Sequence, residues 1–154
     1  MAKKTAKVTD ISLGLNQKQQ FRIDGDDNRI IELDVSDITV IHRLREVYPK
    51  LNDLGIKGFD IDDSADDTEG QLDSMITALN AIDKEMRDII DYVFDSKISD
   101  ICLPTGAMYN MRNGQFMFER ILDVLFSLYA ENIQSEFGKM SARMKAHTDK
   151  YTGK

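Results

Sequence analysis

The sequence predicts an α+β fold, mainly α, in which an N-terminal β-hairpin packs on a bundle of three to four helices and the last helix is long. Two apolar segments that alternate around a turn predict the hairpin, and two apolar stripes at helical spacing predict the long helices. A chain of 154 residues can bury one core. We place this single domain at 20–146, after a weakly ordered segment at 1–19 and before a basic flexible tail at 147–154.

The hairpin is expected at about 20–25 and 29–35. Its apolar residues alternate with polar neighbours on either side of a Gly-Asp-Asp-Asn turn, and they are Phe21, Ile23, Ile31, Leu33 and Val35. Since a two-stranded hairpin is marginal alone, its apolar face must lie on helices. Apolar residues in the preceding segment are candidate anchors for the N-terminus, and they are Val8, Ile11, Leu13 and Leu15.

A first helix follows, with Ser36 or Asp37 as its N-cap, and Pro49 is expected to end or kink it. An acidic connector then runs from Gly55 to Gly70. A long helix is predicted at about 69–94, with a capping box at its start. Its apolar residues form one continuous stripe, which consists of Leu72, Met75, Ile76, Leu79, Ile82, Met86, Ile89, Ile90 and Val93.

After a short helix at 96–102, the segment "LPTG" breaks the chain, and Asn113-Gly114 is expected to start the last helix, at about 114–146. The apolar arc of this helix is wide from Met117 to Tyr129, which predicts burial between neighbours. Beyond that point the arc narrows to a seam at residues spaced four, three and four, which are Ile133, Phe137, Met140 and Met144. This spacing is typical of a helix that meets one partner helix.

The core is therefore expected to end between Tyr129 and Ile133. This boundary leaves Met117 inside the core. It puts Met108 and Met111 at its border, and it leaves the two methionines of the seam free to hold a partner.

Composition excludes several functional classes. Hydrophobic residues make up 42% of the chain and charged residues 31%, as in ordinary globular proteins. The formal net charge of −7 opposes nonspecific binding of nucleic acid. No apolar run approaches the roughly 18 residues of a membrane span. A single cysteine cannot form an internal disulfide, which favours a reducing compartment such as the cytoplasm.

We expect no metal, no cofactor and no enzymatic activity. The acidic connector fails as a calcium loop, because a loop that starts at Asp60 has Ala65 where glycine is needed and Gln71 where glutamate is needed. One cysteine and two histidines are too few and too scattered for a zinc site. Cys102 is expected to pack as a small hydrophobic residue, and His42 to lie in water.

Protein binding remains as a functional class. Methionine-rich surfaces suit it, because they adapt to varied apolar partners. The alternative for any single methionine is that it fills a corner of the core. The cluster in "MYNMRNGQFMF" and the later seam together favour one exposed apolar surface. The candidate binding residues are Met108, Met111, Phe116, Phe118, Ile133, Phe137, Met140 and Met144.

Two long segments carry a family resemblance that covers most of residues 20–130. The segments "FRIDGDDNRIIELDVSDITVIHRLREVYPKLNDL" and "DYVFDSKISDICLPTGAMYNMRNGQFMFERILDVLFSLY" resemble the tail assembly chaperones of long-tailed bacteriophages. The matching positions of the first segment are Ser36, Asp37 and Arg43 or Arg45. The chain departs from the family where Phe-Gly is common, at Phe94-Asp95 and at Cys102-Leu103.

The resemblance implies a non-enzymatic protein of the host bacterial cytoplasm that binds and shields the tape-measure protein and recruits tail-tube subunits. The open hairpin edges, or the same helices, also favour a homo-oligomer. Two alternatives stay open. The open edges also suit a structural part of the virion, such as a neck or tail-completion protein, and the acidic charge also suits a regulatory adaptor directed at the host.

Overall fold

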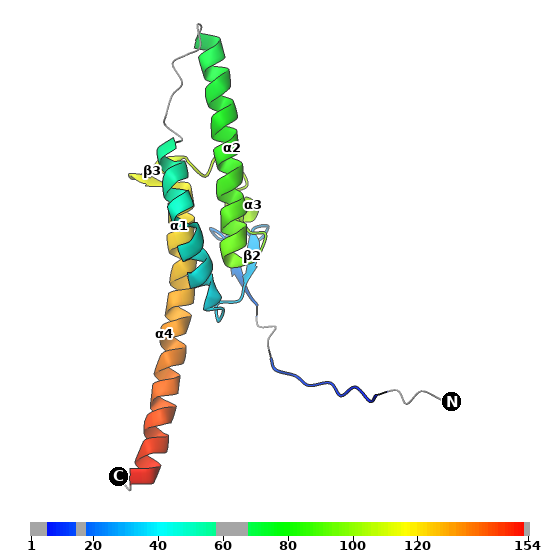
Figure 1. The fold of residues 1–154 in the computed structure, drawn as a ribbon, viewed down its shortest axis with the longest axis vertical. Coiled ribbons are helices and arrows are strands. Elements are labelled where there is room, and N and C mark those ends of the chain that lie inside the picture. Colours follow the sequence, from blue (N-terminus) through cyan, green and yellow to red (C-terminus); the bar gives the residue numbers. More distant parts are fainter. Residues whose placement is uncertain (1–5, 15–17, 58–67, 153–154) are drawn as a thin grey trace, which may run out of the picture.

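A computed structural model of the chain describes residues 6–14, 18–57 and 68–152, and it confirms a mainly helical α+β fold. Figure 1 shows α2 and α4 as long helices, with α1 lying beside them. The described elements, in chain order, are β1 (Gln19–Arg22), β2 (Ile30–Leu33), α1 (Thr39–Lys57), α2 (Thr68–Phe94), α3 (Ser99–Cys102), β3 (Met111–Arg112), β4 (Gln115–Phe116) and α4 (Met117–Thr152).

The first hairpin pairs β1 and β2 in antiparallel register, with Phe21 opposite Ile31. Its turn has positive φ at Asp24 and Gly25, so the tight bend falls on residues that tolerate this conformation. Arg29 holds the hairpin against α3, because its Nε atom donates to the carbonyl oxygen of Ile101 at 3.0 Å. A second bond from the same guanidinium reaches the carbonyl of Cys102. The hairpin therefore lies on helices, as the pattern predicted.

Asp37 caps α1, as one of the two predicted candidates. Its Oδ1 atom accepts the backbone N–H of Thr39 at 3.0 Å, and its Oδ2 atom accepts Nη2 of Arg43 at 2.8 Å. Arg43 also donates to the carbonyl oxygen of Val93 at 2.8 Å, which joins the start of α1 to the end of α2. The prediction that Pro49 ends the helix is wrong, because α1 continues through it to Lys57.

The long helix α2 agrees closely with the predicted range, but only its second half is buried. The buried residues are Ile82, Met86, Ile89, Ile90, Val93 and Phe94. Leu72 and Ile76, in the same predicted stripe, are more than half exposed. Figure 1 shows the reason: the first turns of α2 extend beyond the described parts of the other helices, so no described neighbour covers them.

Two acidic residues of α2 organise the segment after it. Asp91 accepts the backbone N–H groups of Ile98 and Ser99 at 2.9 and 2.8 Å, so it caps α3 from outside that helix. Asp83 accepts the backbone N–H of Met108 at 2.7 Å. The Asp91 bonds fix the start of α3 against α2, and the Asp83 bond holds the loop between α3 and β3 there and carries Met108 into the core.

The segment Asn113-Gly114 does not start the last helix, so that prediction is wrong. Asn113 and Gly114 have φ of 56° and 73°, and they form the turn of a second small hairpin in which Met111 pairs with Phe116. Asn-Gly is the preferred sequence of a two-residue hairpin turn, because both residues tolerate positive φ. The last helix begins only at Met117.

The core ends along α4 where the sequence predicted. Tyr129 is 1% exposed and its ring lies 5.7 Å from that of Phe94, whereas Ile133 is only partly buried. Every residue from 134 to 148 is exposed. The predicted flexible tail is wrong for 147–152, because α4 continues to Thr152. A lysine in its last turn suits the negative end of the helix dipole.

The described part of the N-terminal segment does not reach the core. Val8, Ile11 and Leu13 are strongly exposed, so the prediction that they anchor the segment is wrong. Leu15 and most of the acidic stretch Asp60–Glu69 lie outside the described residues.

Candidate protein-binding surface

The second half of α4 carries an exposed apolar stripe. We call Ile133, Phe137, Met140 and Met144 the α4 stripe. Phe137 is 52% exposed, Met140 39% and Met144 58%, and Ile133 is half-buried at the end of the core. This half of the helix projects away from the other elements in Figure 1. The predicted seam is therefore an accessible surface in the isolated chain.

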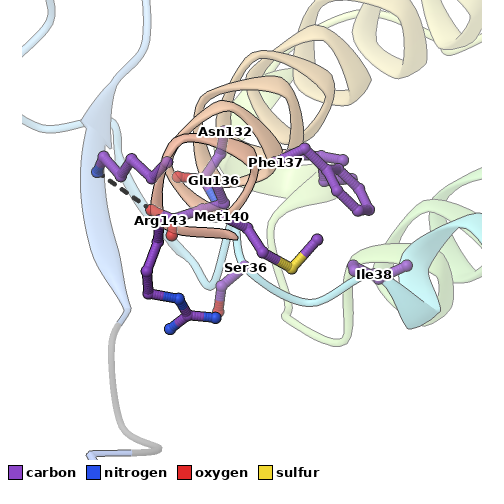
Figure 2. Close-up of a pocket in the computed structure, with 9 residues that line it drawn as sticks. Ser36, Ile38, Asn132, Glu136, Phe137, Met140 and Arg143 are labelled. Carbon is purple, nitrogen blue, oxygen red and sulfur yellow. Dashed lines mark hydrogen bonds and ion pairs between the residues drawn. The ribbon is translucent and has the colours of Figure 1, made fainter. Parts of the chain in front are cut away.

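A groove of about 420 Å³ borders the stripe. We call it the first groove. One wall is Ser36 and Ile38, just before α1, and α4 forms the other. Figure 2 shows Phe137 and Met140 on the side of α4 that faces Ile38. The remaining residues of this groove are Asn132, Ile133, Glu136, Lys139 and Arg143.

Asn132 fixes the geometry of the first groove. Its Nδ2 atom donates to the carbonyl oxygen of Val35 at 3.2 Å, which ties α4 to the segment between β2 and α1. The bond lies at the level where the core ends, so Ser36 and Ile38 stay beside the base of the projecting helix. The groove is thus held by hydrogen bonding rather than by apolar packing alone.

The rim of the first groove carries both signs of charge. Lys139 and Glu136 form an ion pair of 3.4 Å, drawn in Figure 2, with both side chains mostly exposed. Arg143 lies one further turn along the same side of α4. An exposed pair of this kind stabilises the helix little, by about 0.3 to 0.5 kcal/mol, and it leaves these charges available to a partner.

A second groove, of about 400 Å³, lies between α1 and the first half of α4. The aromatic rings of Phe116 and Phe118 stack at its end, with centroids 5.3 Å apart and planes 16° apart. Its lining residues are Leu44, Tyr48, Leu51, Asn52, Phe116, Phe118, Glu119, Leu122, Asp123 and Phe126.

The eight candidate residues do not form one surface, so that expectation is wrong. Met108 is 0% exposed and Phe118 is buried, which removes both from any exposed surface of this chain. Asp83 draws Met108 into the core, and Phe118 belongs to the first turn of α4, which the core covers. Met111 is exposed on β3, apart from the stripe. Phe116 lines the second groove and not the first.

Two exposed apolar residues of the grooves were not among the predicted binding residues. Ile38 is about half exposed in the first groove, and Tyr48 is more exposed in the second. In the first predicted helix, apolar residues at helical spacing begin at Val40. Ile38 precedes them, so periodicity gave no reason to single it out. An apolar residue beside the cap Asp37 was the available signal.

None of the described His, Cys, Asp and Glu side chains form a group of three or more that could hold a metal ion. Cys102 is buried, and burial raises the pKa of its thiol to about 11, so little reactive thiolate exists at neutral pH. None of the described helices is long and apolar enough to cross a bilayer.

Comparison with family models, with curated proteins and with solved structures finds no match for this chain. The residues themselves are therefore the basis for a proposal about function.

Proposed function

We propose that this protein is a non-enzymatic tail assembly chaperone of a long-tailed bacteriophage, which acts in the host cytoplasm. It holds an apolar helical segment of the tape-measure protein against the α4 stripe and the first groove, and it shields that segment until the tail tube closes around it. The observation that supports this function most directly is the exposed apolar stripe on the half of α4 that extends beyond the core.

A partner helix is the occupant that fits the stripe best. Apolar residues spaced four, three and four present a seam one side chain wide, which matches the seam of another amphipathic helix. Ile38 stands across the groove, so a helix in this place would touch apolar atoms on two sides. Methionine side chains adapt to different shapes, which suits a partner whose successive segments differ in sequence.

The size of the stripe implies weak binding per copy. Burial of one exposed apolar side chain contributes about 1.5 to 3 kcal/mol, whereas association costs at least roughly 4 kcal/mol. A stripe of a few residues therefore gives modest affinity for one segment. Several copies on one long tape-measure chain would together keep it soluble, which is the behaviour expected of a chaperone that is later released.

The test is co-expression with the tape-measure protein of the same phage, with the soluble fraction of that protein as the measurement. We expect the wild-type chain to keep the partner soluble, and the triple variant F137S/M140S/M144S to lose this effect. The three side chains are exposed, so each substitution should change the stability of the fold by less than about 0.5 kcal/mol.

The variant V8S/I11S/L13S is the matched control, because it also removes three exposed apolar side chains, but from the N-terminal segment. It should retain the solubilising effect. If the stripe variant keeps the partner as soluble as the wild-type chain does, the α4 stripe is not the binding surface and the proposal fails.

Purified virions separate this function from the structural alternative. A chaperone is absent from the finished tail, whereas a neck or tail-completion protein is present in a fixed number of copies. Quantitative mass spectrometry of particles measures the difference. A stoichiometric amount of this chain in the particle would replace the chaperone function with a structural one.

A further inference from the structure

We propose that two copies of the free protein pair through the α4 stripe as an antiparallel helix dimer. The spacing of the stripe reads the same from either end, since its residues are separated by four, three and four positions. A two-fold axis between Gly138 and Lys139 therefore sets Ile133 of one copy opposite Met144 of the other. The same axis sets Phe137 opposite Met140.

The charges beside the stripe complement themselves under the same two-fold axis. Glu136 and Arg143 are seven residues apart, so they lie on one flank of the helix. In the antiparallel arrangement Glu136 of each copy meets Arg143 of the other, which produces two opposite-charge pairs by symmetry. Lys139 already contacts Glu136 at 3.4 Å, and a carboxylate can accept from both cations at once.

The opposite flank carries no charge, since Gln134 and Ser141 occupy the corresponding positions. In a parallel pair, one flank of each helix meets the other flank of its neighbour, so Glu136 would face Ser141 and its attraction to Arg143 would be lost. Charge therefore favours the antiparallel arrangement, whereas the apolar stripe alone would allow either.

The position of the axis sets the distance between the two cores. The axis lies about nine residues beyond Tyr129, the last fully buried residue of α4, so each core stands roughly 14 Å from the axis along the helix. The end of each helix then runs back toward the other core. There it meets the first groove, where Ile38 provides an apolar contact near Met144 of the second copy.

The dimer uses the surface assigned to the tape-measure segment, but it does not depend on that function. Four stripe residues from each copy make a small interface, below the roughly 1,200 Å² of standard stable complexes. We therefore expect a dissociation constant in the micromolar range, about 10 to 100 µM. Such a weak dimer would cover the apolar stripe in the free protein without blocking a longer partner.

Sedimentation equilibrium up to about 300 µM tests the dimer on the full-length chain. We expect a reversible monomer–dimer equilibrium for the wild type. R143E sets Glu136 against a glutamate in both pairs, and E136R sets Arg143 against an arginine, so each should raise the dissociation constant about tenfold. The swap E136R/R143E restores both pairs and should return the constant to within about threefold of the wild type.

K145E is the matched control, because it makes the same charge change as R143E but lies about 110° around the helix from the centre of the stripe, on the side opposite to Glu136 and Arg143. It should leave the dissociation constant within about twofold. A wild-type chain that stays monomeric throughout overturns the dimer. So does a swap variant that binds no better than the single variants.

Spin labels report the orientation of the two helices. A label on K150C lies about 12 positions from the axis in each copy, so an antiparallel pair separates the two labels by roughly 35 Å or more, and a parallel pair by about 10 to 20 Å. The native Cys102 is buried and its thiol pKa is about 11, so the introduced cysteine reacts first. A short distance would overturn the antiparallel arrangement.

The outcomes for the dimer and for the proposed function are separable. If the charge variants dissociate the dimer while the tape-measure protein stays soluble, both proposals hold. If the wild type is monomeric but still solubilises the partner, the dimer fails and the chaperone function stands.

Discussion

At the scale of single residues, three arginines join the ends of the helices. Arg29 donates to carbonyl oxygens of α3, Arg43 to the carbonyl of Val93 near the end of α2, and Arg87 to the carbonyls of Leu103 and Gly106. Helix ends and loops leave carbonyls without backbone partners, and a planar guanidinium can satisfy several at once. Their side chains are 16% to 20% exposed, so these bonds are shielded from water.

Arg87 has the largest such role, and we expect R87M to lower the free energy of unfolding by about 2 to 4 kcal/mol. The substitution keeps apolar packing but removes bonds of 2.9 Å to each of Asp83 and Asp100, together with those to the loop carbonyls. Urea unfolding measures the loss. R45M, at an exposed position of α1, is the control and should change stability by less than about 0.5 kcal/mol.

Asp37 should make stability depend on pH in the acid range. Burial raises the pKa of its carboxyl, but hydrogen bonds from Thr39 and Arg43 outweigh burial and hold the pKa below its ordinary value of 3.8. The folded state therefore favours the ionised carboxylate. Its stabilising contribution is complete above pH 3.8 and is lost as the pH falls through the lower folded pKa.

We therefore expect D37N to be less stable than the wild type at neutral pH, and the gap to narrow as the medium becomes acidic. Urea unfolding of both chains between about pH 3 and pH 7 measures the gap, and the other carboxylates cancel in the comparison. A gap that stays constant across this range would contradict the assigned role of Asp37.

At the scale of elements, the small hairpin of β3 and β4 aims the chain into α4. Its turn glycine, Gly114, has a φ of 73°, and a methyl group added there would meet no atom within 4 Å. The cost of G114A is therefore a backbone cost, and we expect a loss of about 1 kcal/mol in urea unfolding.

Gly138 is the matched position, because it also has open space around a Cβ atom but lies inside α4. We expect G138A to stabilise the projecting helix by about 1 kcal/mol, seen as slower hydrogen exchange of the amides near it. Equal effects of the two substitutions would mean that backbone conformation does not decide them.

Much of each element could be predicted from periodicity, and the errors at α2 and at Pro49 share one physical cause. The apolar period fixed the face and the length of α2, yet Leu72 and Ile76 are exposed. A repeat shows which face of a helix is apolar, but a neighbour must be present to bury it, and the position of neighbours is a tertiary property. The error at Pro49 has the same cause. Residues on both sides of it pack against the core, and the helix continues through it.

At the scale of the whole molecule, the core and the α4 stripe lie in different parts of the chain. Among the described residues, the buried core includes none after Tyr129, so the described turns of α4 beyond it contribute little to the core. We expect a chain truncated after Gln134 to keep its free energy of unfolding within about 1 kcal/mol of the full-length value. The same truncation should abolish both the dimer and the capture of the tape-measure protein.

Urea unfolding and sedimentation of the truncated chain measure the two expectations separately. A large loss of stability would contradict the separation of core and stripe. A truncated chain that still dimerises would locate self-association elsewhere, for example at the edges of the first hairpin.

The candidate surface could be predicted where it depends on one helix and not where it depends on distant contacts. The α4 stripe followed from spacing alone, because an isolated helix presents its seam without help. Met108 could not be placed in this way, since its burial depends on a hydrogen bond to Asp83, 25 residues earlier in the chain. Ile38 gained its position through the bond between Asn132 and Val35, which links residues 97 positions apart.

The projecting half of α4 also has a genetic consequence. Since residues 134–148 are exposed and lie outside the core, random substitutions there should seldom reduce the amount of protein in the cell. A screen that scores abundance and phage yield together would then divide the chain in two. Substitutions that remove yield while abundance stays normal should gather on one side of this helix, and they would outline the surface without knowledge of what binds it.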